Sequence, residues 1–127
     1  MLTLTDDAPL VEIQLTSEFQ RKLKALAKKY RKIQTDLQPI LEQLQIGAFL
    51  GNQIPDIGFV VIKVRLKNSD SQKGKSGGYR LIYWIVSPEV IVLLDIYSKS
   101  DQSDNEVDEI RQIIKGLGTT SEATIDA

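Results

Sequence analysis

Residues 60–67 form an alternating apolar and basic run that constrains this chain more than any other feature. An apolar residue recurs at every second position and β-branched residues are frequent, which is typical of a half-buried β-strand. Because successive side chains of a strand point to opposite faces, Lys63, Arg65 and Lys67 are expected to share one face. A protein core does not accept such a face without counter-charges. The face is therefore expected to meet solvent or an anionic ligand.

A polar loop and a second strand follow this run. Residues 68–78 are rich in Ser, Gly and Lys and offer almost nothing that a core could bury, whereas residues 79–83 again have the composition of a strand. If the two strands pair antiparallel, Arg80 joins the cations of the first strand on one sheet face. Tyr79 and Tyr83 alternate with Arg80, so we expect at least part of this aromatic set to point into the core.

The loop contains a glycine-rich stretch at residues 74–78. Its composition is found in phosphate-binding loops, but it lacks the spacing of a Walker sequence and no helix follows it. We therefore do not expect it to bind a nucleotide. Its basic residues, Lys73 and Lys75, are suited to contact with a phosphodiester backbone instead.

The totals indicate a single domain. A chain of 127 residues suffices for one core, and an apolar content of 42% with a charged content of 26% is ordinary for a globular protein. We expect an N-terminal extension over residues 1–9, a folded domain over residues 10–117 and a disordered tail over residues 118–127. No stretch is apolar enough to cross a bilayer and residues 1–9 lack the pattern of an export signal, so we expect a cytoplasmic protein.

Cysteine and histidine are absent from the chain. Without cysteine there is no disulfide framework and no thiol nucleophile. Without histidine the usual general base and the usual zinc ligand are missing. The acidic residues near the C-terminus form no Asp-x-Asp loop, so we interpret them as a solvated helix face. The sequence predicts no metal and no cofactor.

The net charge of −1 results from opposite charges that lie in different segments. Residues 19–32 hold seven cations and no acid, and residues 60–83 hold six cations and one acid. Residues 101–127 hold seven acids and two cations. A segregated basic surface on a nearly neutral protein indicates a polyanionic partner.

Two helices are predicted between a first strand at residues 10–15 and the central strands. Thr16, or the serine after it, can cap the first helix, which carries an apolar stripe at helical spacing. A capping box at residues 35–38 predicts the start of the second helix, with Pro39 in its first turn and Gly47 as its end. The pair is expected to form a helical hairpin.

The C-terminal half completes a small α+β domain. Residues 48–57 are predicted to be a loop, and the run 90–97 is apolar on both faces, which places it in the middle of the sheet. A second capping box at residues 103–106 opens a last helix that is expected to end at Gly116. The expected order is β-α-α-β-β-β-α, with a mainly antiparallel sheet covered on one face by the helical hairpin.

The last predicted strand contains two polar residues, Asp95 and Tyr97, that are candidates for a functional role. Asp95 lies within an apolar run and is either a buried hydrogen-bonding group or the partner that orients a nearby cation, and the sequence leaves both open. Tyr97 lies at a strand end next to Ser98 and Lys99. We therefore interpret it as a better site candidate than Tyr79 and Tyr83, whose parity is opposite to that of Arg80.

Together these segments resemble the RelE/ParE superfamily of bacterial toxins from type II toxin–antitoxin modules, in particular the RelE/HigB branch of ribosome-dependent mRNA endonucleases. The resemblance covers about residues 10–115. Its specific parts are Phe19-x-x-x-Leu23 in the basic first helix, the segments 63–66 and 93–99, and the block Lys-Ser-Gly-Gly-Tyr-Arg at 75–80, which is the most distinctive. The resemblance implies a RelE-like fold for the domain.

The resemblance also implies roles for single residues. Lys63 and Arg65 occupy the positions of paired basic residues that act on the scissile phosphate in this family. Arg80 matches the arginine after Gly-Tyr that stabilises the phosphate in the transition state. Lys99 lies near the position at which the family carries a further basic residue, at the end of the last strand. Relatives often carry a catalytic tyrosine in the C-terminal region, for which Tyr97 is the only nearby substitute.

In such enzymes the RNA 2′-hydroxyl attacks the adjacent phosphorus, and lysine and arginine take the place of a histidine pair. Crowded positive charges favour the neutral form of a lysine, which can then act as a base, and arginine holds phosphate with two donors. We therefore predict Lys63 as the general base. The predicted RNA contacts outside the catalytic set are Lys67, Lys73, Lys75 and Ser76.

The resemblance implies three partners, namely a cognate antitoxin protein, the ribosome and mRNA, and it implies neither a membrane nor a small-molecule cofactor. Two alternatives stay open. The first is a ParE-like DNA gyrase inhibitor of the same fold, although such inhibitors generally lack the full Lys/Arg set. The second is a catalytically weakened RNA-binding relic, which the missing C-terminal tyrosine and the acidic C-terminal segment favour.

Overall fold

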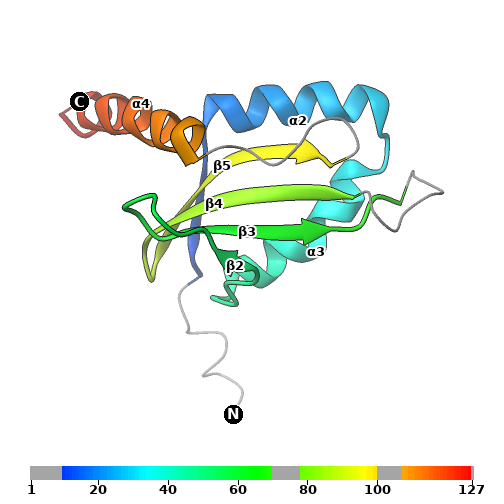
Figure 1. Ribbon diagram of the computed structural model, residues 1–127. Helices are drawn as coiled ribbons and strands as arrows, with labels where there is room; N and C mark the ends of the chain where they lie inside the picture. The colour runs from blue at the N-terminus through cyan, green and yellow to red at the C-terminus, as the bar shows by residue number, and fades with distance from the viewer. Residues whose placement is uncertain (1–9, 70–77, 100–106, 127) are drawn as a thin grey trace, which may run out of the picture.

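The computed structural model of this protein describes residues 10–69, 78–99 and 107–126, with side chains as far as residue 117 in the last helix. Figure 1 shows the arrangement of its elements. In chain order these are β1 (Glu12–Leu15), α2 (Ser17–Lys29), α3 (Ile33–Gln45), β2 (Asn52–Gln53), β3 (Val61–Leu66), β4 (Tyr79–Ser87), β5 (Val90–Ser98) and α4 (Val107–Asp126). The predicted α+β class is confirmed.

The strands form one five-stranded sheet in the order β1-β5-β4-β3-β2. β1 pairs parallel with β5, whereas the other neighbouring pairs are antiparallel. The sheet is therefore mainly antiparallel, as predicted, and β5 has a neighbour on each side, as its apolar sequence indicated. A register shift between Ile82 and Tyr83 on β4 places Asp95 opposite Ile82 and Leu93 opposite Tyr83, so β5 contains a bulge.

Each face of the sheet carries its own core. The first core lies under α2 and α3 and includes Phe19, Ile33 and Leu37 from the helices, with Tyr79 and Tyr83 from β4. The tyrosine pair is fully buried, in agreement with its predicted inward parity. The helical hairpin thus covers one face of the sheet, as expected.

The second core lies between the opposite face and α4. Ile110 and Ile114 of α4 pack there against strand residues that include Val61, Ile82 and Leu94. On β3 this core ends at Val61, and the next side chain on the same face is Lys63. The face is therefore apolar where α4 covers it and basic beyond.

The start of α3 differs from the prediction. The helix begins at Ile33, and Lys32 at its N-cap makes no side-chain capping bond, so the predicted capping box at residues 35–38 does not open it. Ile33 and Leu37 are both buried in the first core, and their burial extends the helix toward the N-terminus. Pro39 consequently lies inside the helix instead of in its first turn, and it has no N–H to donate to the carbonyl of Thr35.

Two further element boundaries differ from the prediction. Residues 52–53, predicted to belong to a loop, form β2 at the edge of the sheet. The helix α4 continues past the expected end at Gly116 as far as Asp126, so it includes most of the segment predicted as a tail. The predicted capping box at residues 103–106 lies outside the described residues. Within the described part of the chain, no helix is long and apolar enough to cross a membrane.

Candidate functional site

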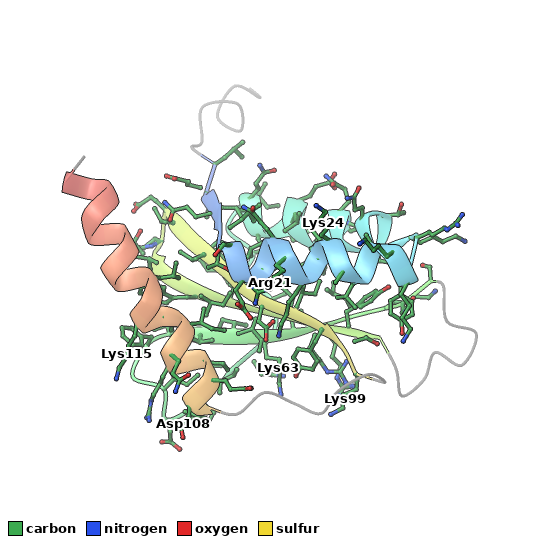
Figure 2. All side chains as sticks on the ribbon, turned by 90° about the horizontal axis from the view of Figure 1, so that it is seen from above. Arg21, Lys24, Lys63, Lys99, Asp108 and Lys115 are labelled. Atoms are coloured by element: carbon green, nitrogen blue, oxygen red, sulfur yellow. The ribbon has the colours of Figure 1, made fainter. Side chains whose placement is uncertain are left out.

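A cavity of about 500 Å³ opens beside β3 on the basic part of the sheet. It is lined by Gly51, Asn52, Lys63, Val64, Arg65, Arg80 and Lys99. The structure thus brings together the four basic residues that the sequence predicts as catalytic. They come from three separate segments, namely β3, β4 and the residue after β5, and Figure 2 shows Lys63 and Lys99 on the same side of the sheet.

The pairing of β3 with β4 sets the spacing of the central cations. Arg65 lies directly opposite Arg80, and Lys63 lies two residues earlier on β3, opposite Ile82. Side chains directly opposite each other in an antiparallel pair have Cβ atoms about 4.5–5.5 Å apart and share a face, and like charges in that relation are destabilising. Two arginines facing each other therefore concentrate positive charge at this part of the sheet.

The cations differ in their exposure. Arg65 is exposed and Lys63 is half-buried, whereas Arg80 is only 7% exposed. The guanidinium of Arg80 donates a hydrogen bond from Nη1 to the carbonyl of Tyr79 at 3.3 Å. This bond restricts the side chain, and because a guanidinium has five N–H donors it can bind more than one acceptor. Arg80 is therefore a positioned cation, and Arg65 at the open side is an adaptable one.

Lys99 lies where three strand ends meet, namely the end of β3, the start of β4 and the end of β5. Its backbone N–H donates to the carbonyl of Gly78 at 2.9 Å, which ties the end of β5 to the start of β4. Gly78 has a φ of +87° and packs so closely against the carbonyl of Leu66 that a Cβ atom there would collide with it. A glycine is required at this position for both reasons. The Gly-Tyr-Arg sequence thus places Arg80 and Lys99 on one side of the sheet.

Two further predicted site residues, Lys67 and Tyr97, do not line the cavity. Lys67 is exposed immediately after β3 and is not part of the lining. Lys73, Lys75 and Ser76 lie outside the described residues. Tyr97 is 2% exposed and belongs to the second core, packed with the apolar residues under α4.

The sequence did not point to Gly51 and Asn52 as site residues. This pair was interpreted as part of a turn, whereas the structure places it along the edge of β3, where it forms one wall of the cavity. A two-residue strand has no periodicity, so only the Gly-Asn pair itself could have signalled it.

Asp95 combines both roles that the sequence left open. It is fully buried, and one carboxylate oxygen, Oδ1, accepts a hydrogen bond from the N–H of Ile96 at 2.9 Å. The same oxygen lies 2.9 Å from Nζ of Lys22 on α2. The bond to the Ile96 N–H satisfies part of a buried carboxylate, and the ion pair fixes α2 against β5.

The chemistry open to the cavity follows from its side chains. Arginine binds phosphate oxygens with paired donors, and lysine can bind an anion or transfer a proton. Among the described residues no group of three acidic side chains is placed to hold a metal ion. No protein-family model matches the sequence, and no curated protein matches it. The assignment of a function therefore rests on the residues of the cavity.

Proposed function

We propose that this protein is the toxin of a type II toxin–antitoxin pair, with a RelE-like fold, and that it acts as a ribosome-dependent mRNA endoribonuclease. The observation that carries the proposal is the convergence of Lys63, Arg65, Arg80 and Lys99 on one cavity. The order of elements and the helical hairpin on one sheet face support it further.

The cavity is suited to an RNA phosphate. The facing pair Arg65 and Arg80 offers several N–H donors to the two non-bridging oxygens, on which negative charge grows as the phosphorus becomes pentacoordinate. Arg80 is held in place before the reaction by the bond from its Nη1 to the carbonyl of Tyr79, whereas the exposed Arg65 can adjust to the phosphate. The volume of about 500 Å³ lies within the range of small-ligand sites and leaves room for more than a phosphate group.

The reaction we propose is an in-line transfer within the RNA. Lys63 acts as the general base and takes the proton of the 2′-hydroxyl, and the 2′-oxygen forms a bond to the adjacent phosphorus. The bond from phosphorus to the 5′-oxygen of the next nucleotide breaks, and Lys99 gives a proton to that oxygen. The products are a 2′,3′-cyclic phosphate and a free 5′-hydroxyl.

The proposed partners are the ribosome with its mRNA and a cognate antitoxin. The ribosome would hold mRNA extended so that one phosphate enters the site, which explains why cleavage would depend on translation. A cognate antitoxin would place acidic and apolar side chains over the basic face and so neutralise it.

A second candidate is a catalytically weakened RNA-binding protein of the same fold. The observation that favours it is the burial of Tyr97 in the second core, since no tyrosine lines the cavity among the described residues. The cations would then bind RNA without the aromatic hydroxyl that relatives often supply.

Induced expression in a bacterial host, with the 5′ ends of mRNA mapped before and after induction, tests the proposal. We expect growth arrest and new 5′ ends inside translated codons, and we expect the purified protein to cut mRNA in a translating extract but not the same mRNA without ribosomes. Growth arrest with DNA breaks and intact mRNA would contradict the proposal in favour of a gyrase inhibitor. Binding of mRNA with neither arrest nor cleavage would favour the weakened protein.

A further inference from the structure

We propose that Asn52 contacts the base of the nucleotide held in the cavity and discriminates between bases. The cations would then bind the RNA backbone, while the β2 wall would select sequence. This inference rests on the proposed function and adds a specificity-determining residue to it.

Asn52 differs in kind from the other lining residues. Seven of the described residues line the cavity, of which four are cations, one is glycine and one is valine. Asn52 is the remaining one, and its side-chain amide offers both a donor and an acceptor without carrying charge. Contacts to phosphate fix the position of a nucleic acid but carry no sequence information, whereas contacts to base edges do. The amide is thus the lining side chain suited to choose a base.

The register of β2 directs this side chain toward the site. Asn52 lies directly opposite Lys63 in the antiparallel pair, so the two side chains share a sheet face, and Asn52 is exposed. The next residue, Gln53, lies opposite Ile62 of the first core and points to the other face. The amide therefore lies beside the proposed general base.

The segment that carries Asn52 is anchored on both sides. Before it, the hydroxyl of Tyr83 donates to the carbonyl of Leu50 at 2.5 Å. After it, the N–H of Ile54 donates to the carbonyl of Val61 at 2.8 Å. A side chain held between two such bonds is positioned despite the shortness of β2, which a base-selecting group requires.

Gly51 brings this segment flush against β3. Its φ is +111°, and a Cβ atom there would lie 2.6 Å from the carbonyl oxygen of Lys63 and 2.7 Å from Cγ2 of Ile62. Only a glycine therefore lets the chain pass this close to β3 immediately before Asn52. An asparagine amide can form two hydrogen bonds with one base edge, as it does with adenine, and the unstacked bases of single-stranded RNA present such edges.

The test maps cut sites in a translating extract for the unaltered chain, Asn52→Ala, Asn52→Thr and Gln53→Ala. Threonine favours strand structure, so Asn52→Thr guards against misfolding of the alanine variant. Gln53→Ala is the matched control from the opposite face of the same strand. Circular dichroism and the thermal midpoint check that each variant folds.

We expect the unaltered chain and Gln53→Ala to enrich one base next to the cut by about fivefold or more, as one good amide–base contact allows. Both Asn52 variants are expected to cut with less than about twofold enrichment. Cleavage by the unaltered chain with no base preference, or a preference that both Asn52 variants retain, would overturn this inference alone. Absence of cleavage by the unaltered chain would overturn the proposed function together with it.

Discussion

The positions of single side chains around the cavity depend on a few buried polar contacts. Tyr83 anchors the segment before β2 through its bond to the carbonyl of Leu50, and burial raises the pKa of Tyr83 from 10.0 to about 12 because the phenolate would lose its hydration. Lys22 joins α2 to the buried carboxylate of Asp95. These contacts do not touch the cavity, yet they hold the elements that form it.

The first prediction at this scale concerns the pH dependence of stability. Folding keeps Tyr83 protonated at pH values where the unfolded chain has lost the proton. The contribution of this group to stability is therefore fully present below pH 10.0 and is lost as the pH rises toward about 12. Tyr83→Phe should cost about 1 kcal/mol at neutral pH through the lost hydrogen bond.

The difference in the free energy of unfolding between the unaltered chain and Tyr83→Phe measures this effect, because titrations of other groups cancel. Urea unfolding at pH 8 to 12 should show the difference shrinking as the pH rises. A difference that stays constant across this range would contradict the assignment of the raised pKa to Tyr83.

The second prediction concerns the buried ion pair. Lys22 is 30% exposed and Asp95 is not exposed at all, with 2.9 Å between Nζ and Oδ1. Lys22→Met removes the cation from a buried carboxylate and should lower the free energy of unfolding on the order of 2 to 3 kcal/mol. Arg21→Met is the matched control, because Arg21 pairs with Glu18 at the surface and its loss should cost less than about 1 kcal/mol. Equal costs in urea unfolding would show that the buried pair does not fasten α2.

At the scale of the element, the edge segment around β2 shapes the cavity although it contributes only two strand residues. Its path depends on Gly51, which adopts a positive φ and lies against β3 with no space for a side chain. A comparison with Gly47 separates the effect of the positive φ from the effect of the missing space. Gly47 also has a positive φ, of +90°, but a Cβ atom there would meet nothing within 4 Å.

Gly51→Ala should therefore destabilise the protein more than Gly47→Ala. The left-handed backbone alone costs about 1 to 2 kcal/mol for a residue with a Cβ atom, which is the expected cost at Gly47. At Gly51 the collision with the backbone of Lys63 adds to it, and β2 should shift away from β3. Urea unfolding of both variants gives the comparison. A smaller cost for Gly51→Ala would contradict the close packing of this segment.

The elements with strong periodicity were predictable from the sequence. The alternation of residue types predicted that Lys63 and Arg65 share one face of β3. On β4 it predicted that Tyr79 and Tyr83 lie on the face opposite to Arg80. The structure has this arrangement. The spacing of these cations follows from the pleat alone once the two strands pair. The central cations of the candidate site could therefore be predicted from the sequence alone.

Other features depend on tertiary contacts that no local pattern carries. Burial of Ile33 starts α3 earlier than its capping box and draws Pro39 into the helix. Tyr97 was interpreted as a site candidate because it lies at a strand end, but it is buried in the second core. The pairing of Asn52 with Lys63 joins residues eleven positions apart through two strand residues, which gives no repeat to detect.

At the scale of the whole molecule, one sheet face has two parts, an apolar part that belongs to a core and a basic part that forms the candidate site. Its apolar part lies under α4 and forms the second core, while the basic part beyond Val61 forms the cavity. The first core on the opposite face holds the strands in register, so the cations need not contribute to packing. The basic part thus concentrates positive charge at the open part of a packed sheet, where it attracts an anion. The central claim is that this anion is an RNA phosphate.

The rate of mRNA cleavage in a translating extract by Lys63→Ala, measured beside Lys24→Ala, tests this claim most directly. Lys24 is an exposed lysine of α2 that points away from the cavity side in Figure 2, so its loss changes the charge equally without touching the site. We expect Lys63→Ala to lower the rate by about 100-fold or more, the usual effect of removing a general base. Lys24→Ala should stay within about threefold of the unaltered chain. Full cleavage by Lys63→Ala would contradict the account.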